Sequence, residues 1–290
     1  MTEPRVKQLS DPEIINVLDL AQANNSDAFQ ISYNENKTTV GLIKNSTTSI
    51  DLILTCVPDS NLLLLMLPEE EVRKLVSVSP KFDTTYYELG DNAFKDEYGY
   101  EKGNLKKFIL DTASKNQENC ITIYNIFLDR ETGDIVSSVM SDRYNVKDQP
   151  VNYLWSLFTN PKYYRKGYAH QLITLIMNYC LGQSMQFKMP PPIFNAMAFI
   201  WNTASINLFK KLGFEVVKII NSENDPEKRK TLKKHTYEGN EYTEDQEMLL
   251  TFDPLKEIKE KIRNLQPSED QPFDEITKED KKEDQTTTNE

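Results

Sequence analysis

The stretch that decides the fold is Asn160-Pro161-Lys162-Tyr163-Tyr164-Arg165-Lys166-Gly167-Tyr168-Ala169. A run typical of a β-strand, 152–159, precedes it, and apolar residues at helical spacing, 169–180, follow it. The first N–H groups of a helix have no partner inside the helix, and the helix dipole adds partial positive charge there. A turn leading into a helix can therefore bind an anion, and Arg165 and Lys166 add full positive charge. An ordinary loop with two exposed cations explains the same residues equally well.

Strand and helix patterns alternate on both sides of this stretch. Upstream, 131–134 is typical of a hairpin turn, and downstream Gly213 stands where a second helix would end. The predicted strands are 120–128, 135–140, 152–159, 193–199, 215–220 and 247–252, and helices are predicted from residues 104, 167 and 202. This order predicts an α/β fold with a mixed central sheet and helices on both faces.

The N-terminal part gives weaker patterns. Ser10-Asp11-Pro12-Glu13 is typical of a helix start, because it combines a capping residue, a proline and an acid in the first turn. Residues 38–57 favour one or two strands, and a second helix is predicted from Pro68. Residues 80–103 support no assignment, and the basic segment 228–235 is interpreted as a solvated loop.

Two motifs resemble the GNAT superfamily of acyl-CoA N-acyltransferases. In the first, Gly167 and Ala169 match the small positions of the family's coenzyme A signature, while Tyr164 stands where a glutamine or arginine is usual. In the second, Asn202 and the run 212–214, Leu-Gly-Phe, match the family's asparagine, helix, Leu-Gly-Phe pattern. The resemblance implies a GNAT-like acyltransferase fold.

The resemblance also implies a site for acetyl-CoA as co-substrate and for an amine acceptor. The strand ending at Thr159 would part from the strand starting near Ile193, and the pantetheine arm would lie in the gap. The backbone of Leu157 to Thr159 would pair with it and polarise the thioester carbonyl, and the amides of Arg165 to Ala169 would hold the pyrophosphate. The implied coenzyme-binding residues are Leu157, Phe158, Thr159, Tyr164, Arg165, Lys166, Gly167, Tyr168, Ala169, Asn202 and Ser205.

The catalytic residues implied are Tyr153 and Asn202. An amine of pKa about 10.4 is only about 0.1% neutral at pH 7, so some group must accept its proton. The position of the family's usual tyrosine acid falls on Phe209, which has no proton to donate. Tyr153 stands where some relatives have a glutamate base and would position water; the alternative is a half-buried strand aromatic. Asn202 would lie beside the pantetheine or the sulfur, and it is equally a typical helix N-cap. Asp142 and Tyr144 are interpreted as surface-turn residues that could reach the same cleft.

Composition excludes several classes of protein. The 290 residues carry a net charge of −11, of which 267–290 alone carry −6, so the chain lacks the basic face of a nucleic-acid binder. Cys56, Cys120 and Cys180 show no metal-ligand spacing, and the only histidines are His170, expected on the phosphate side, and His235; no metal is predicted. No apolar run is long enough to cross a membrane, and no secretory signal is visible, so no membrane partner and a cytoplasmic location are expected, with the nucleus as the alternative.

The predicted organisation has four parts. Residues 1–103 would form the acceptor side of the domain, 104–252 the GNAT-like acetyl-CoA-binding core, 253–266 a short amphipathic helix and 267–290 a disordered acidic tail. The resemblance and the acidic tail lead to three candidate functions. The first, which the resemblance implies, is an N-acetyltransferase acting on a small-molecule or protein amine. The second is a non-catalytic CoA-binding regulatory module, which the phenylalanine at 209 favours, and the third is an interaction protein that uses its acidic tail.

Overall fold

A computed structural model of the chain describes residues 10–18, 29–33, 39–44, 48–98, 101–113, 120–221 and 226–256. The chain divides into two compact units, Met1–Asp253 and Pro254–Glu290, and the description below concerns the first. Nearly all of the predicted helix 253–266 and the whole predicted tail 267–290 lie outside the described residues.

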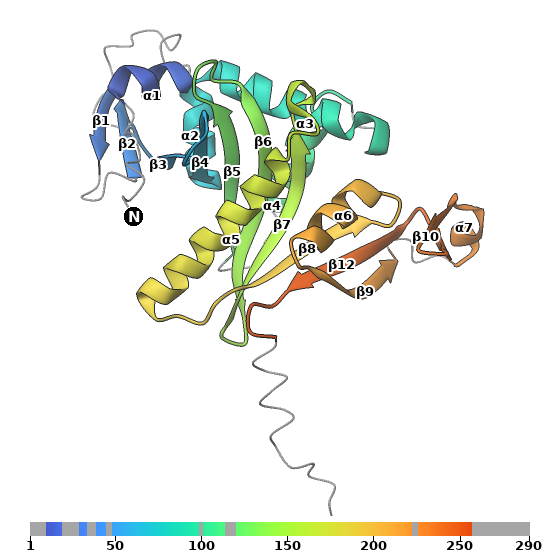
Figure 1. Ribbon diagram of the computed structural model, residues 1–290. Coiled ribbons are helices and arrows are strands. Elements are labelled where there is room, and N and C mark those ends of the chain that lie inside the picture. Colours follow the sequence, from blue (N-terminus) through green and yellow to red (C-terminus); the bar gives the residue numbers. More distant parts are fainter. Residues whose placement is uncertain are drawn as a thin grey trace, which may run out of the picture. The chain divides into compact units, whose positions relative to one another are not determined.

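The centre of the first unit is a ten-stranded sheet with the order β1-β2-β3-β4-β5-β6-β7-β8-β12-β9. Its strands are β1 (Phe29–Tyr33), β2 (Thr39–Lys44), β3 (Thr48–Cys56), β4 (Leu62–Pro68), β5 (Ile121–Asp129), β6 (Ile135–Val146), β7 (Gln149–Thr159), β8 (Ile193–Phe199), β9 (Glu215–Asn221) and β12 (Gln246–Phe252). Neighbouring strands run antiparallel except β7 and β8, which are parallel, so the sheet is mixed as predicted. Figure 1 shows this sheet running from β1 to the β8–β12–β9 part.

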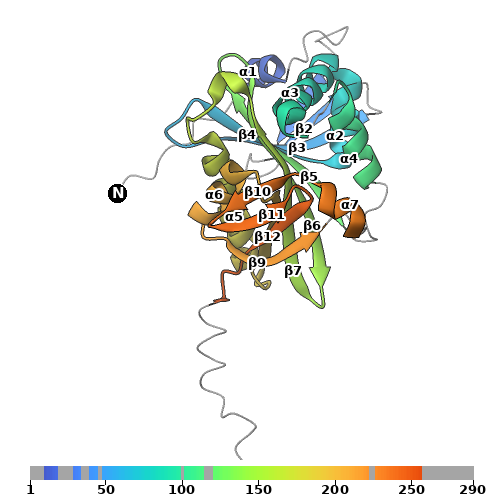
Figure 2. The same cartoon turned by 90° about the vertical axis from the view of Figure 1, so that its right-hand side faces the viewer.

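Helices cover both faces of the sheet, which confirms the predicted layers. They are α1 (Asp11–Val17), α2 (Glu69–Val78), α3 (Pro80–Tyr98), α4 (Asn104–Ala113), α5 (Tyr168–Phe187), α6 (Thr203–Lys211) and α7 (Pro226–Thr231). Side chains of one face of β5, such as Tyr124 and Ile126, join the core under α1 to α4, whereas Ile123 and Phe127 join the core under α5 and α6. Figure 2 shows α2, α3 and α4 gathered on one side of the sheet. None of the helices in the described part of the chain is long and apolar enough to span a bilayer.

Several local predictions are confirmed, because short-range chemistry decides them. Ser10 caps α1 in a capping box: its backbone N–H donates to Glu13 Oε2 at 2.8 Å, and its hydroxyl is 2.9 Å from the same oxygen. The residues 38–57 hold β2 and β3, and α2 follows Pro68 as predicted.

Other segments differ from the sequence-based expectation. The unassigned segment 80–103 contains α3, whose Tyr86 is buried against the sheet and contacts Ser138 Oγ through its hydroxyl at 3.0 Å. Helical spacing there is hidden because Tyr86 serves as a core residue rather than as a surface residue. β6 extends to Val146 rather than ending near residue 140, so Asp142 and Tyr144 lie on a strand and not in a surface turn. The predicted loop 228–235 holds the end of α7 and the start of a small hairpin, β10 (Lys234–Tyr237) with β11 (Asn240–Thr243).

Candidate functional site

The site begins where β7 and β8 part. Their parallel pairing covers only Val151–Leu154 of β7 and Ile193–Ala196 of β8, although both strands continue beyond it. Ser156 has a φ of 47°, and the register between β6 and β7 shifts at this point, so β7 carries a bulge that turns its end away from β8. The expected gap between these strands is therefore confirmed.

The turn after β7 has the geometry of an anion cradle. A short 3-10 turn, Pro161–Tyr163, is followed by Arg165 and Gly167, whose φ values are 60° and 80°. Gly167 is the N-cap of α5 and no side chain caps this helix, whose first closing bond runs from Gln171 N to Gly167 O at 3.0 Å. Successive backbone N–H groups in such a turn converge on one point and carry partial positive charge.

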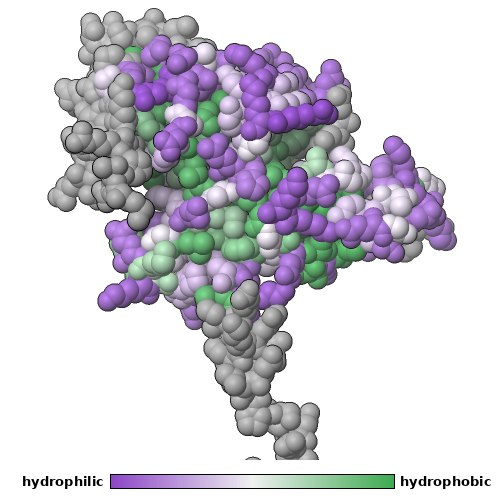
Figure 3. Space-filling view, viewed as in Figure 1, coloured by the Kyte–Doolittle hydropathy of each residue, from purple (hydrophilic) through white to green (hydrophobic). Residues whose placement is uncertain are grey.

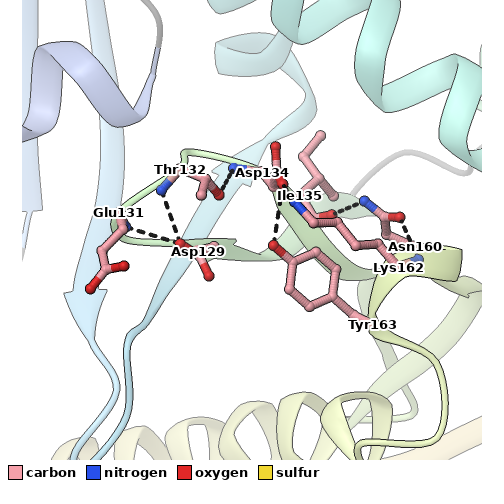
Figure 4. A network of polar contacts seen from close by, with 8 residues as sticks. All are labelled: Asp129, Glu131, Thr132, Asp134, Ile135, Asn160, Lys162 and Tyr163. Atoms are coloured by element: carbon pink, nitrogen blue, oxygen red, sulfur yellow. Dashed lines mark hydrogen bonds and ion pairs between the residues drawn. The ribbon is translucent and has the colours of Figure 1, made fainter.

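A polar network holds this turn against the β5–β6 turn (Figure 4). Asn160 Oδ1 accepts from the backbone N–H of Lys162 at 3.1 Å, and its Nδ2 donates to the carbonyl of Ile135 at 2.9 Å. The carboxylate of Asp134 accepts from Lys162 Nζ at 2.6 Å and from the Tyr163 hydroxyl at 3.2 Å. The Lys162 hydrogen bond is the main reason why the pKa of Asp134 lies below its usual value. These side-chain contacts hold the turn in place, so its backbone N–H groups are not needed to fix its shape.

A pocket of about 350 Å³, here called the turn pocket, opens over these N–H groups. It is lined by Ala93, Phe94, Leu157, Phe158, Thr159, Tyr163, Tyr164, Arg165, Gly167, Tyr168, Ala169, His170, Asn202, Ala204, Ser205 and Leu208. A Cβ added at Gly167 would meet no protein atom within 4 Å, so the space above the turn is open.

A second pocket of about 400 Å³, here called the aromatic pocket, lies at the other end of the gap. Its lining residues are Phe94, Phe108, Tyr153, Leu154, Trp155, Ser156, Leu157, Met197, Ala198, Phe199, Asn202, Ser205, Phe209 and Glu247. The rings of Phe108 and Trp155 meet edge to face at 5.9 Å and form part of its wall. Figure 3 shows hydrophobic surface in the hollow between α3 and α6. Both pockets share Phe94, Leu157, Asn202 and Ser205, so they meet inside the gap.

Glu247 and Tyr153 are the ionisable lining residues of the aromatic pocket. Glu247 lies on β12 opposite Phe199 of β8, and burial raises the pKa of its carboxyl above the usual value near 4.5. Burial also raises the pKa of Tyr153, and the nearby charge of Glu247 raises it further, so the phenol keeps its proton near neutral pH. A carboxylate that is costly to leave charged and a protonated phenol thus share an apolar chamber.

Residues 85–214 match the model of the acetyltransferase (GNAT) family. This stretch, 130 of the 290 residues, is therefore similar to a GNAT acetyltransferase domain. No curated protein sequence matches the chain.

Solved structures give distant likenesses to the chain. The ribosomal-protein-S18-alanine N-acetyltransferase from Escherichia coli is 12% identical with a TM-score of 0.39, over 66% of this chain and 92% of that one. Arabidopsis thaliana Naa50 in complex with the bisubstrate analogue CoA-Ac-MVNAL is 11% identical with a TM-score of 0.40, over 67% of this chain and 99% of that one. Arabidopsis thaliana NAA60 in complex with acetyl-CoA is 13% identical with a TM-score of 0.37, over 65% and 97%.

The predicted site residues fall mostly around the gap. Of the predicted coenzyme-binding residues, all except Lys166 line the turn pocket, and Tyr153 lines the aromatic pocket. Lys166 is directed elsewhere, with its Nζ 5.3 Å from the centre of the Tyr163 ring. Phe158 lies with its ring buried under α3, so only its backbone can face a ligand. Asn202 is an N-cap whose Oδ1 accepts from Ser205 N at 3.1 Å, and it still lines both pockets.

Two placements differ from the sequence-based interpretation. Asp142 is buried on β6, accepts from Thr122 Oγ1 at 2.7 Å and does not line either pocket, and neither does Tyr144. Sequence reasoning also missed Glu247, since a single acid at the start of a strand carries no signal until the fold brings it beside Tyr153.

Proposed function

We propose that this chain is an N-acetyltransferase that moves an acetyl group from acetyl-CoA directly to a primary amine. The observation that carries the proposal is the continuous path from the turn pocket, through the β7–β8 gap, to the carboxylate of Glu247. An anion cradle, an unpaired strand edge and a buried base are the three parts that such a transfer needs, and the two pockets with their four shared lining residues support this arrangement.

The coenzyme would occupy the turn pocket and the gap. Its diphosphate would accept hydrogen bonds from the N–H groups of 165–169, with Arg165 adding charge. The pantetheine amides would pair with the edge of β7 beyond Leu154, which has no β8 partner there. One N–H group of Leu157 to Thr159 would donate to the thioester carbonyl and stabilise the oxyanion as the amine attacks.

The acceptor amine would enter the aromatic pocket. Glu247 would accept the proton of the ammonium, because its raised pKa brings the base closer to the amine in proton affinity. The neutral nitrogen then attacks the carbonyl carbon, the C–S bond breaks, and the nitrogen loses its second proton as the amide forms. The departing thiolate of coenzyme A takes up that proton through water, and Glu247 returns the first proton to solvent. Tyr153, which keeps its own proton, would orient the amine or a water molecule between the amine and Glu247.

The walls of the aromatic pocket indicate the acceptor. Phe94, Phe108, Trp155, Met197 and Phe199 offer apolar and aromatic surface, and Glu247 is the one carboxyl group in the lining. A primary amine whose remaining part is apolar or aromatic fits this pocket better than one that carries further charged groups. The apolar part can be buried against the walls of the pocket.

The alternative is a module that binds coenzyme A without turnover. Phe209 favours it, because this buried side chain lies at the position of the family's usual proton donor and packs on Phe214 with ring centres 5.1 Å apart. A thiolate leaving group needs less help than an amine, so turnover remains compatible with this residue.

Thiol release separates the two functions. The full chain is incubated with acetyl-CoA and three amine pools, namely peptides with apolar N-terminal residues, lysine-bearing peptides and arylalkylamines, and free thiol is recorded. The enzyme predicts release with at least one pool of apolar amines. Tight binding of coenzyme A in calorimetry without release in any pool would establish the binding module instead.

A further inference from the structure

A third pocket, of about 250 Å³, lies near the C-terminal end of α5, away from the turn pocket at its N-terminal end. It is enclosed by the β6–β7 hairpin, the last turns of α5 and the proline segment 190–192. In Figure 1 the end of α5 and the β6–β7 turn lie at the same end of the domain. Its lining includes Arg143, Asn152, Cys180, Ile121 and Met189. No part of the proposed transfer reaction uses this pocket.

Arg143 is the unusual member of this lining. Its Nε and Nη2 are buried and have no hydrogen-bond partner, and no carboxylate of the described residues forms an ion pair with it. Its guanidinium carbon lies 5.9 Å from the centre of the Tyr179 ring, which holds the plane of the group but accepts no strong hydrogen bond. Buried donors without partners destabilise the folded state and are rare in folded proteins.

The neighbouring amide is unpartnered as well. Asn152 stands directly opposite Arg143 in the β6–β7 register, and its Oδ1 is buried without a donor while its Nδ2 is 3.2 Å from Cys180 Sγ. Exchanging the oxygen and nitrogen of this amide lets the thiol donate to Oδ1 and gives Nδ2, a donor, the position that Oδ1 now holds.

The geometry points to a binding site for a small organic carboxylate in this pocket. The Nε and Nη2 hydrogens of a guanidinium form the parallel fork that matches the two oxygens of a carboxylate. Arg143 lines the pocket and is partly exposed, so a rotation of its side chain would present this fork, and the Asn152 amide would add a third donor. Ile121 and Met189, which are 57% and 51% exposed, would cover the apolar part of the ligand. The volume fits a ligand of about the size of a phenyl-substituted short-chain acid rather than a cofactor.

The test compares 4-phenylbutyrate with its neutral amide on the full-length chain by ligand-observed NMR titration. The carboxylate should bind at least tenfold more tightly than the amide, because only the acid forms the charge-assisted fork. Arg143→Gln should remove this preference. The matched control is Lys147→Gln, an exposed cation in the β6–β7 turn, which should bind as the parent does. Gly167→Asp should also leave this binding unchanged, which excludes the turn pocket as the site.

A second variant keeps the test decisive if Arg143→Gln fails to fold. Asn152→Asp places a carboxylate opposite Arg143, so it should raise the thermal midpoint of the free chain and abolish binding of 4-phenylbutyrate. Three results would each overturn the proposed site: equal affinity for acid and amide, full affinity in Arg143→Gln, or no binding of the acid at 10 mM. Ordered water would then be the partner of the Arg143 guanidinium.

Discussion

The turn pocket presents main-chain N–H groups of consecutive residues, whereas the aromatic pocket is assembled from side chains of α3, α4, β7, β8, α6 and β12. Backbone donors survive most substitutions, because every residue except proline supplies one. Side-chain walls can be replaced one by one. Under the proposed function, binding of the coenzyme would therefore depend on the shape of a single turn, while chemistry and acceptor choice would depend on separate residues that vary independently.

The two pockets also differ in how they handle charge. Around the turn, the ionised Asp134 is stabilised by Lys162 and Tyr163, so its pKa is lowered. In the aromatic pocket, Glu247 is desolvated without a cation, so its pKa is raised. The ion pair of Asp134 and Lys162 holds the turn in place. The ionised carboxyl of Glu247 instead lowers the stability of the fold, as is common for reactive groups. Substitutions that affect one pocket and leave the other intact test this division.

The largest effect is expected from Glu247→Gln. It should lower kcat roughly 100-fold or more, since removing a positioned base typically has that consequence. The Kd for coenzyme A should stay unchanged, because Glu247 lines the aromatic pocket and not the turn pocket. Thiol release measures the first quantity and calorimetry the second. Glu131→Gln, an exposed carboxyl in the β5–β6 turn, serves as the control.

The pH profile gives the same residue an independent signature. With the pKa raised, the base is protonated below a value higher than 4.5, so kcat of the parent should fall as pH falls through that value. Glu247→Gln should lose this acid limb. A variant that is slower but keeps the limb would assign the base to another group.

These two pockets were not equally visible in the sequence. The turn could be predicted because Gly167, Ala169 and the helix that follows form a local pattern whose function depends on backbone geometry. The strand gap followed from the same motif. The aromatic pocket could not be predicted, since Phe94, Phe108, Tyr153 and Glu247 come from four elements that only the fold brings together. α3 could not be predicted from helical spacing, because Tyr86 is a core residue. The strand position of Asp142 could not be predicted, because the end of β6 lacks apolar alternation.

A smaller but still clear effect is expected from Gly167→Asp. A carboxylate over the turn should weaken binding of coenzyme A by roughly 10- to 100-fold through like charge and lost space. The fold should persist, because a Cβ there meets no atom within 4 Å and Asp tolerates a positive φ better than most residues. Gly239→Asp is a close control, with a φ of 79° and equally open space in the β10–β11 turn. Equal losses of affinity in both variants would remove the turn from the coenzyme site.

A few-fold effect is expected from Asp134→Asn. The amide keeps the shape but loses the charge-assisted bond with Lys162, so the turn before α5 becomes less firmly fixed. Affinity for coenzyme A should fall about 2- to 5-fold, as expected for a largely exposed ion pair. The ratio of affinities should be constant from pH 5 to pH 8, because the lowered pKa keeps Asp134 ionised throughout. Glu238→Gln breaks a similar exposed pair with Lys210 at 2.7 Å, neither residue of which lines either pocket, and should change nothing.

The smallest effect concerns stability and returns to Glu247. A carboxyl whose pKa is raised by folding destabilises the folded state above its unfolded pKa near 4.5, and that penalty is complete once the pH exceeds the folded pKa. Glu247→Gln should therefore melt roughly 1 to 3 °C higher than the parent at pH 8, and the difference should shrink towards pH 4.5. Thermal melts of both chains across this range, with Glu131→Gln alongside, measure it. A variant that is inactive and also less stable at pH 8 would mean that Glu247 supports the structure of the aromatic pocket. The two pockets would then differ in side-chain packing and not in how they stabilise a charged group.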